Sequence, residues 1–427
     1  MKSIEQIAAA LQGYDPQALS VDQVNAFLAE LVQPVSANES QDVYLFDALG
    51  RVLAQDVISP ISVPAHNNSA MDGFAFDAAQ LQADQPLTLR VVGTALAGKA
   101  WQGKVNAGEC LKIMTGAILP DGLDTVVPQE FCHIESAHDV TTVTLPPNIL
   151  KAGDNRRLMG EDLMEGQPAL KVGQHLTPAA LGLVASLGLP DVRVHRRLRV
   201  AYFSTGDEVL SLGDAPREGA VYDSNRYTVF GLLTRMGCEV IDMGVVRDEP
   251  ALLETAFAKA ALEADAIITS GGVSVGEADF TKAMMKKLGD VAFWKIAMRP
   301  GRPMAVGRIG KSVLFGLPGN PVAVMVTFLA FVRPALLRMM GSTAQPAPLL
   351  RAKCLEPLRK KAGRTEYQRG FVSSAPDGTL QVRTTGNQGS GVLSSMVQGN
   401  GLIVLHHAQG NVALGDEVDV MMFEGAV

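Results

Sequence analysis

The chain has 427 residues, of which 47% are hydrophobic and 19% charged, and its formal net charge is -7. One hydrophobic core seldom grows to this length, so we expect two to four domains, and the apolar fraction excludes wholesale disorder. The negative net charge argues against nucleic-acid binding, so an anionic ligand needs a local basic cluster.

The cysteines and the chain's apolar segments indicate a cytoplasmic protein. The four cysteines are scattered, without a second cysteine or a histidine at metal-site spacing, which is typical of core thiols in a reducing compartment. The amino-terminal segment carries Glu5 and Asp15 around a short apolar run, unlike an export signal. The apolar stretch 322–332 is about half of a membrane span, so we expect a buried helix and no membrane association.

Taken in chain order, the first elements predict two small domains. A helical pattern covers 21–32, and an extended stretch follows it. Between 87 and 143 the hydrophobic period shortens towards two and turn signals recur, which predicts a small β-domain at 61–162. A proline-initiated helical pattern comes next, and we assign 1–60 together with 163–195 to an accessory α/β layer.

The central region has the alternation of a βαβ fold. Short apolar runs alternate with helical patterns over 224–236, 251–261 and 320–340. We therefore predict a doubly wound, mostly parallel sheet at 196–345, with helices on both faces and ligands beyond the carboxyl ends of its strands. Short strands and turns over 346–427 predict a C-terminal β-domain, so the fold class is multidomain α/β.

Polar loops follow four predicted strands of the central domain, and we expect these loops to converge in space. The loop Ser204-Thr205-Gly206-Asp207-Glu208 has hydroxyls and carboxylates that suit phosphate oxygens and a hard cation. The same residue types also cap helices, so capping remains an alternative. In the second loop, Asp248 can cap the helix that starts near Pro250 or face the crevice.

The third and fourth loops are richer in glycine and proline. In the segment 270–279, SGGVSVGEAD, glycines allow backbone N–H groups to approach an anion, but the Gly-Lys-Ser/Thr ending of a Walker loop is missing. The segment fits a nucleotide or pterin phosphate, with Asp279 near a metal. The fourth loop, GLPGNP at 316–321, is a rigid strand-to-helix turn that can be a stiff connector or a ligand floor.

Between the third and fourth loops lies a basic segment, KIAMRPGRP at 295–303, whose prolines and glycine favour a fixed geometry for oxyanion recognition. The alternative is a row of charged side chains that face the solvent and bind no ligand. Outside the central domain, PAHNNSAMDGFA at 64–75 and MTGAILPDG at 114–122 are polar elbows, and each can be an ordinary turn. Their residues carry little evidence individually.

Together these motifs, in this order and spacing, resemble the MoeA family, which includes the E-domain of gephyrin, over nearly the whole chain. The resemblance implies a molybdopterin molybdenumtransferase of molybdenum cofactor biosynthesis. In that reaction adenylylated molybdopterin, molybdate and Mg²⁺ meet, the pyrophosphate bond is cleaved, AMP leaves, and molybdenum joins the pterin dithiolene. The resemblance also implies an elongated homodimer with its site between one subunit's sheet and the partner's second domain.

The resemblance also assigns roles residue by residue. It makes Asp72 and Thr115, from the second domain, catalytic together with Glu208, Asp248 and Asp279 from the sheet, with Glu208 and Asp279 as the Mg²⁺ ligands. Substrate binding falls to Ser204, Gly271, Gly272, Ser274, Gly276, Lys295, Arg299, Arg302, Pro318, Pro321, Arg369 and Ser394. The chain has RPGRP where many relatives have KPGKP, which keeps the charge but replaces ammonium groups by forked guanidinium groups.

The expected partners are a second copy of the chain, a molybdopterin adenylyltransferase upstream, and molybdoenzymes or their chaperones downstream. Two alternatives remain. A molybdopterin adenylyltransferase resembles only the central domain, and chain length together with MDGFAF argues against it. A non-catalytic molybdopterin-binding scaffold keeps the fold, but the presence of Asp72, Glu208, Asp248 and Asp279 argues against it.

Overall fold

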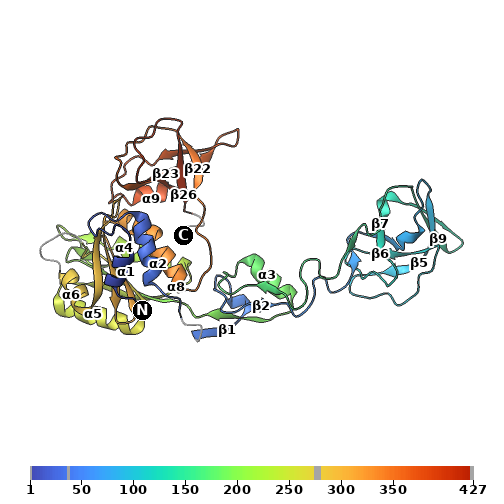
Figure 1. Ribbon diagram of the computed structural model, residues 1–427, viewed down its shortest axis with the longest axis horizontal. Helices are drawn as coiled ribbons and strands as arrows, with labels where there is room; N and C mark the ends of the chain where they lie inside the picture. Colours follow the sequence, from blue (N-terminus) through green and yellow to red (C-terminus); the bar gives the residue numbers. More distant parts are fainter. Residues whose placement is uncertain (1, 36–38, 274–279, 424–427) are drawn as a thin grey trace.

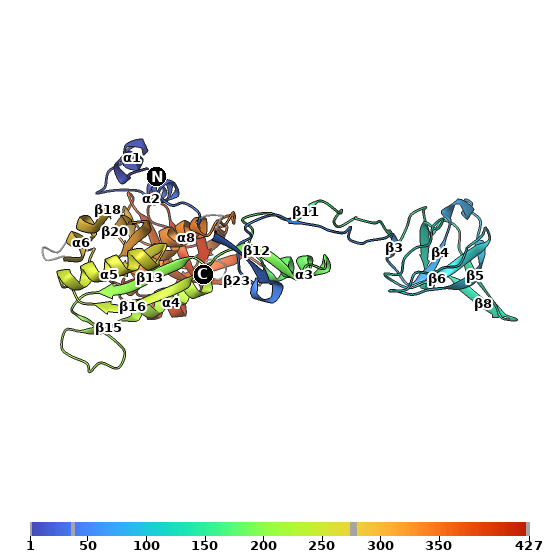
Figure 2. The same cartoon turned by 90° about the horizontal axis from the view of Figure 1, so that it is seen from below.

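The computed structural model describes residues 2–35, 39–273 and 280–423. The molecule is elongated, with an α/β body at one end and a C-terminal β-domain beside it (Figure 1). An arm, residues 39–195, reaches away from the body and ends in a small β-domain (Figures 1 and 2). The multidomain α/β architecture predicted from the sequence is confirmed.

The body is built on one six-stranded sheet. Its strands lie in the order β16 (Glu239–Val246), β13 (Arg199–Thr205), β17 (Ala266–Ser270), β21 (Ser312–Leu317), β20 (Pro303–Ile309) and β18 (Gly289–Lys295). The first four strands are mutually parallel, whereas β20 is antiparallel to β21 and β18 is antiparallel to β20. The mostly parallel sheet is therefore as predicted. The β18–β20 hairpin was not predicted, because its basic connection dominated the interpretation of that segment.

Helices cover both faces of the sheet, as expected. These are α4 (Ser224–Arg235), α5 (Pro250–Glu263), α6 (Phe280–Leu288), and a run formed by α7 (Pro321–Thr327), the π-helical η5 (Phe328–Val332) and α8 (Arg333–Met339). Strand β13 alternates between two cores, because Tyr202 packs in one apolar cluster and Phe203 in the other. Phe203 meets Phe257 of α5 edge-on, with ring centroids 5.1 Å apart. The alternating side chains of a single strand thus bury both faces.

Two amino-terminal helices pack on the body. Helices α1 (Ile4–Ala10) and α2 (Val21–Leu31) each begin with a serine capping box. Phe27 of α2 lies edge-on to Trp294 of β18, with ring centroids 4.8 Å apart. The segment 1–60, predicted to belong to the accessory layer, is therefore shared in this structure between the body and the arm. The domain boundaries remain a prediction.

The helical run Pro321–Met339 is long and apolar enough to pass a compositional test for a membrane span. However, 72% of its apolar window is buried inside the protein. Core helices of water-soluble proteins pass the same test. The expectation of a buried helix over 322–332 agrees with this burial.

The arm has a near part and a far part. In the near part β1 (Ser40–Tyr44) pairs with β12 (Asp191–His195) and β2 (Val57–Ile58) with β11 (Pro168–Leu170), beside α3 (Pro178–Ser186). The far part is a six-stranded sheet flanked by the short pair β3 (Asn68–Ser69) and β10 (Arg156–Arg157). The order in that sheet is β7 (Thr125–Pro128), β4 (Gly73–Phe76), β6 (Glu109–Ile113), β5 (Leu87–Ala95), β9 (Val140–Leu145) and β8 (His133–Ala137).

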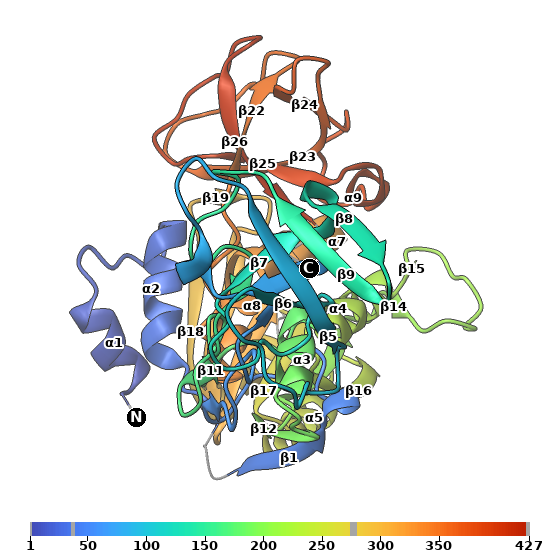
Figure 3. The ribbon, with the colours of Figure 1, turned by 90° about the vertical axis from the view of Figure 1, so that its right-hand side faces the viewer.

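The C-terminal β-domain is joined to the body by a strand that the body supplies. Strand β19 (Met298–Arg299), from the β18–β20 connection, pairs with β23 (Thr365–Ser374). The other members of this sheet are β24 (Leu380–Thr384), β22 (Leu350–Cys354), β26 (Glu417–Met422) and β25 (Gly401–Leu405), with α9 (Ser394–Gln398) alongside (Figure 3). Because β23 pairs with β25 as well as with β24, strands β23, β24, β22, β26 and β25 close into a small β-barrel. The basic segment is thereby fixed between two domains.

Candidate active site

The four polar loops of the body begin side by side. In the sheet register, Ser204 at the end of β13 lies opposite Val245 of β16 and opposite Ser270 of β17. Ser270 in turn lies opposite Leu317 at the end of β21. Because parallel strands end at the same edge, we call this the carboxyl edge. The expected convergence of the loops is therefore what the register shows.

At the carboxyl edge the first two loops are bonded to each other. The backbone N–H of Asp248 donates to Oδ1 of Asp207 over 3.3 Å. Oδ1 of Asp248 accepts from the hydroxyl of Thr281, at the start of α6, over 3.0 Å. This contact directs Asp248 towards the neighbouring loop. Glu208 is exposed and folds back over Gly206, where an added Cβ would lie 2.6 Å from Oε2 of Glu208.

A buried cluster of hydroxyls lies beneath the carboxyl edge. The Tyr202 hydroxyl lies 2.8 Å from Oγ of Ser204 and 2.7 Å from Oγ of Ser270, and the two serine oxygens are 3.2 Å apart. All three side chains are at most 2% exposed. Ser204 therefore links two strands from within the protein, and in this conformation its hydroxyl faces the cluster.

The third loop needs glycine because strands and helix approach it closely. Gly271 has φ +89°, and an added Cβ would lie 2.3 Å from the carbonyl oxygen of Thr205. Gly272 has φ +65°, and its Cβ would meet Thr281 at 2.4 Å. Such contacts and positive φ values exclude larger residues here. The other predicted residues of this loop, Ser274, Gly276 and Asp279, lie outside the described residues.

The fourth loop is held by a residue that the sequence analysis did not single out. Asn225 near the start of α4 donates from Nδ2 to the carbonyl oxygen of Gly319 over 2.7 Å. Within this turn, Pro318 is buried and Pro321 is the first residue of α7. Asp223 caps α4 by accepting from the N–H of Arg226, so the helix end that carries Asn225 is itself fixed.

The basic segment also reaches the carboxyl edge. Lys295 ends β18 and pairs with Pro303 at the start of β20, while Ala305 of β20 pairs with Gly316 of β21. This register places the β18–β20 connection at the same level as the ends of the parallel strands. Lys295 is half-buried there, and Arg299 and Arg302 are exposed.

Arg299 and Arg369 line one cavity of 260 Å³ between the body and the C-terminal β-domain, together with Glu366. Arg369 is only 1% exposed; it donates from Nε to Oγ of Ser395 over 2.9 Å and from Nη2 to the carbonyl oxygen of Gly389 over 2.9 Å. Burial, followed by the charge of Arg299, lowers the pKa of Arg369 to about 10. Ser394, the predicted residue, is exposed at the start of α9, and its buried neighbour Ser395 makes the arginine contact.

Asp72 and Thr115 are brought together in the far part of the arm. Oδ1 of Asp72 accepts from the backbone N–H of Thr115 over 2.7 Å and from its hydroxyl over 2.8 Å. Gly73, which follows Asp72, approaches β7 so closely that an added Cβ would lie 1.9 Å from the carbonyl oxygen of Val127. Both Asp72 and Thr115 are exposed, so the pair is presented to solvent on a rigid strand end.

The two hydrogen bonds from Thr115, first the backbone one and then the hydroxyl one, lower the pKa of Asp72. Because its pKa is depressed, the Asp72 carboxylate stays charged at pH values below the ordinary pKa of an aspartate. The stability that the two hydrogen bonds contribute is lost only as the pH falls through the depressed pKa. Thr115→Val keeps the backbone donor and removes the hydroxyl, so we expect the pKa of Asp72 to rise part of the way to its ordinary value. Carbon NMR titration of the carboxyl group checks this, and an unchanged pKa would contradict it.

Within one chain, the Asp72–Thr115 pair lies far from the carboxyl edge. The far sheet of the arm and the body stand at opposite ends of the molecule in both views (Figures 1 and 2). The predicted site residues that the structure describes therefore fall into two groups, one at the carboxyl edge and the adjoining C-terminal β-domain, and one on the arm.

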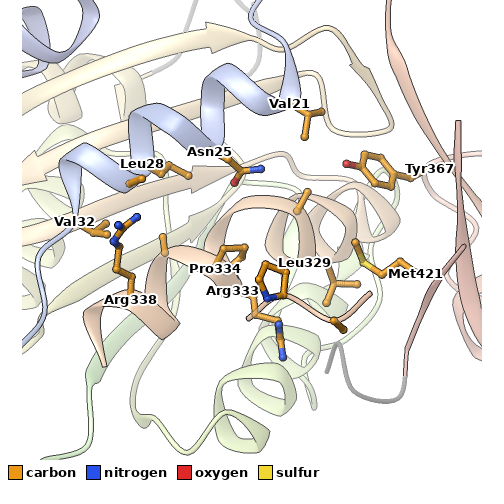
Figure 4. Close-up of a pocket in the computed structure, with 15 residues that line it drawn as sticks. Val21, Asn25, Leu28, Val32, Leu329, Arg333, Pro334, Arg338, Tyr367 and Met421 are labelled. Atoms are coloured by element: carbon orange, nitrogen blue, oxygen red, sulfur yellow. The ribbon is translucent and has the colours of Figure 1, made fainter. Parts of the chain in front are cut away.

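A separate apolar cavity of 420 Å³ lies between α2 and the helical run of α7, η5 and α8 (Figure 4). Its labelled lining includes Leu28, Leu329, Tyr367 and Met421, with the guanidinium groups of Arg333 and Arg338 at its side. Among the described residues, none of the predicted site residues lines it.

Comparison with known proteins places nearly the whole chain in one family. Residues 19–188 match the MoeA N-terminal region (domain I and II), residues 201–338 a probable molybdopterin binding domain, and residues 351–423 the MoeA C-terminal region (domain IV). The molybdopterin molybdenumtransferase of Haemophilus influenzae is 42% identical over 406 residues, which is 95% of this chain and 98% of that protein. That of Bacillus subtilis is 31% identical and covers 90% of each chain.

The fold agrees with this assignment. The crystal structure of the molybdopterin biosynthesis moeA protein from Pyrococcus horikoshii superposes with a TM-score of 0.80 at 25% identity, covering 95% of this chain and all of that one. Family models thus account for both the body and the arm, and the relatives are enzymes by name. The chain therefore belongs to the MoeA family.

Proposed function

We propose that this enzyme completes the molybdenum cofactor by inserting molybdate into adenylylated molybdopterin. In the proposed reaction the pyrophosphate bond is cleaved, AMP is released, and molybdenum is bound by the pterin dithiolene. The proposal rests on the observation that loops with hydroxyls, carboxylates, glycines and cations meet at one carboxyl edge. Ligands of open α/β sheets bind at that edge, and phosphate chemistry depends mainly on positioning and electrostatics.

We infer that Mg²⁺ binds to carboxylates at the edge. Glu208, which is exposed there, would bind the ion together with Asp279, which lies outside the described residues. In the described part of the chain, no group of three or more His, Cys, Asp or Glu side chains forms a metal cage. Mg²⁺ bound by one or two carboxylates, substrate phosphates and water does not require one. When bound, the ion would neutralise the charge of the phosphate oxygens.

Molybdate is proposed to bind beside the phosphate loops, on Lys295, Arg299 and Arg302. These cations are supplied by one connection whose two ends are fixed in the β18–β20 hairpin and whose middle is paired with the C-terminal β-domain. Arg369, whose buried side chain is bonded to the segments around Gly389 and Ser395, is proposed to position the wall of this site. Fixed cations of this kind suit a tetrahedral oxyanion.

Lys295→Ala is expected to raise the molybdate concentration needed for half-maximal turnover by about tenfold, the effect of losing one charge-assisted contact. Affinity for the adenylylated pterin should change much less. The measurement is a molybdate titration of turnover beside direct pterin binding. Lys311→Ala is a matched control, because Lys311 lies in the β20–β21 turn, at the end of the sheet away from the carboxyl edge. An unchanged molybdate requirement in Lys295→Ala would remove this residue from the proposed site.

The enzyme is proposed to act as a homodimer with two shared sites. Asp72 and Thr115 on the arm of one subunit would complete the site at the carboxyl edge of the other, because within one chain the two groups stand apart (Figure 1). A cytoplasmic location fits this proposal, with a molybdopterin adenylyltransferase supplying the substrate and molybdoenzymes or their chaperones receiving the product.

The proposed reaction is tested by mixing the protein with adenylylated molybdopterin, Mg²⁺ and low molybdate, and measuring AMP release and protein-bound or pterin-bound molybdenum. AMP release that depends on molybdate supports the transferase. Consumption of ATP with unmodified molybdopterin would instead indicate an adenylyltransferase. Pterin binding without AMP release under any of these conditions would indicate a scaffold.

A further inference from the structure

The direction of the arm is set at a narrow junction with the body. The arm begins at Glu39, and the chain returns to the body through residues 195–198, between β12 and β13. The arm is long, and Asp72 lies in its far part (Figure 1). A small rotation at the junction therefore produces a large displacement of Asp72 and Thr115.

Arg196 lies in this junction and bonds to both sides of it. Its guanidinium group donates from Nη1 and Nη2 to the two carboxylate oxygens of Asp265, over 2.7 Å each. The same group donates from Nε and Nη2 to the carboxylate of Glu39, over 3.1 and 3.2 Å. Glu39 directly precedes β1 of the arm, and Asp265 directly precedes β17 of the body. One planar guanidinium group thus holds the arm and the sheet together.

The body side of this contact is rigid. The Asp265 carboxylate also accepts from the N–H of Arg199, the first residue of β13, over 2.8 Å. The backbone of Asp265 forms hydrogen bonds with both β13 and β21. Burial alone would raise the pKa of Asp265, but the hydrogen bonds from Arg196 and Arg199 hold it below its ordinary value. The side chains of Arg196 and Asp265 are 19% and 20% exposed, so water screens this pair only partly.

A second, uncharged contact joins the arm to the end of α8. Nε2 of His175 lies 2.8 Å from Oγ of Ser342, and the N–H of Thr343 donates to the carbonyl oxygen of Gly173 over 2.9 Å. Val52 of the arm also packs into the apolar cluster of the body. Apolar packing and single hydrogen bonds tolerate a small rotation of the arm better than a bidentate ion pair does, and Arg196 supplies the bidentate pair.

We propose that Arg196 is a positioning residue that locks the arm in the direction needed for Asp72 and Thr115 to reach the partner's carboxyl edge. This role rests on the shared site proposed above. In this role Arg196 makes no contact with substrate. Its side chain acts by limiting the positions that the arm can adopt. Loss of the lock lowers the fraction of dimers in which both halves of the site are assembled.

The test measures the arm directly, in the full-length protein. Spin labels are attached to cysteines introduced at Glu135 of β8 and Lys259 of α5, both exposed, and their distance distribution is measured by pulsed electron resonance. Arg196→Gln is expected to broaden the distribution and to lower kcat by about 10- to 100-fold, as misplacement of catalytic groups does. Affinity for AMP, which would bind the body alone, should remain unchanged.

Arg193→Gln is the matched control. Arg193 donates to Asp42 over 2.9 Å and to Ser40 over 2.9 Å, so its partners, unlike those of Arg196, lie entirely within the arm. This variant should keep the narrow distribution and wild-type kcat. A distribution in Arg196→Gln as narrow as in the wild type would overturn the lock, and a broad one with unchanged kcat would overturn its role in the reaction. Failure of the shared site itself would appear separately, as full activity in an Asp72 variant with unaltered spin-label distances.

Discussion

Asp72→Asn is expected to lower turnover by about 100- to 1,000-fold, the usual effect of removing one preorganised electrostatic group from a reaction centre. The carboxylate is held by two hydrogen bonds from Thr115 and is exposed at the end of a rigid strand. Asparagine has the same size and keeps an oxygen that can accept from Thr115, so the fold should survive. Molybdate-dependent AMP release, measured beside the melting temperature, checks both parts of this expectation.

The control for Asp72→Asn is Glu135→Gln, which removes a carboxylate from the same β-domain. Glu135 is exposed in β8 and lies 3.0 Å from the His133 ring, outside either half of the proposed site. It should leave turnover unchanged. Equal activities of the two variants would remove Asp72 from the chemistry.

Gly271→Ala is expected to have the largest effect on stability at the carboxyl edge. The new Cβ would lie 2.3 Å from a backbone oxygen, and the residue has φ +89°. Because the clashing atom belongs to β13, the loop or the strand must shift, and we expect a loss of about 3 kcal/mol or more together with most of the activity. Denaturant unfolding measures the first loss, and AMP release measures the second.

Gly386→Ala separates backbone strain from the clash. Gly386 has a similar φ of +85°, but nothing lies within 4 Å of its added Cβ. Strain alone should cost about 1–2 kcal/mol there, with turnover unchanged. If Gly271→Ala were no more destabilising than Gly386→Ala, the close approach of the third loop to β13 would not be a constraint on this fold.

Most of the fold follows from hydrophobic periodicity and turn residues. The four parallel strands of the body are continuous apolar runs between helices, so a parallel sheet with a common carboxyl edge was predictable, whereas the order of the strands was not predicted. The β18–β20 hairpin was missed because MRPGRP looked like an irregular loop, although a proline–glycine turn between apolar runs is also typical of a hairpin connection. Helix α2 was correctly placed along the sequence, whereas α1 was not predicted. The packing of α2 on the body depends on a long-range contact, Phe27 with Trp294, which no local pattern shows.

Residues of the candidate site were predictable where they belong to a recognisable local sequence motif. Glycines that approach other backbone segments, such as Gly271 and Gly272, stand out in sequence, and so does the Met-Asp-Gly elbow that carries Asp72. Pairings across loops were not predictable, because Asp207, Thr281 and Asn225 acquire their roles only through neighbours from other elements. That Ser395 contacts Arg369 was not predictable either, because this contact depends on which residue of α9 faces inward.

The measurement that tests the central claim most directly is complementation between two inactive variants. Asp72→Asn removes the arm's half of the proposed site, and Asp248→Asn removes a carboxylate at the carboxyl edge. If each site combines one subunit's arm with its partner's sheet, co-expressed variants should recover about a quarter of wild-type molybdate-dependent AMP release, since half of randomly paired dimers are mixed and each mixed dimer has one intact site. A mixture no more active than either variant alone would contradict the shared site.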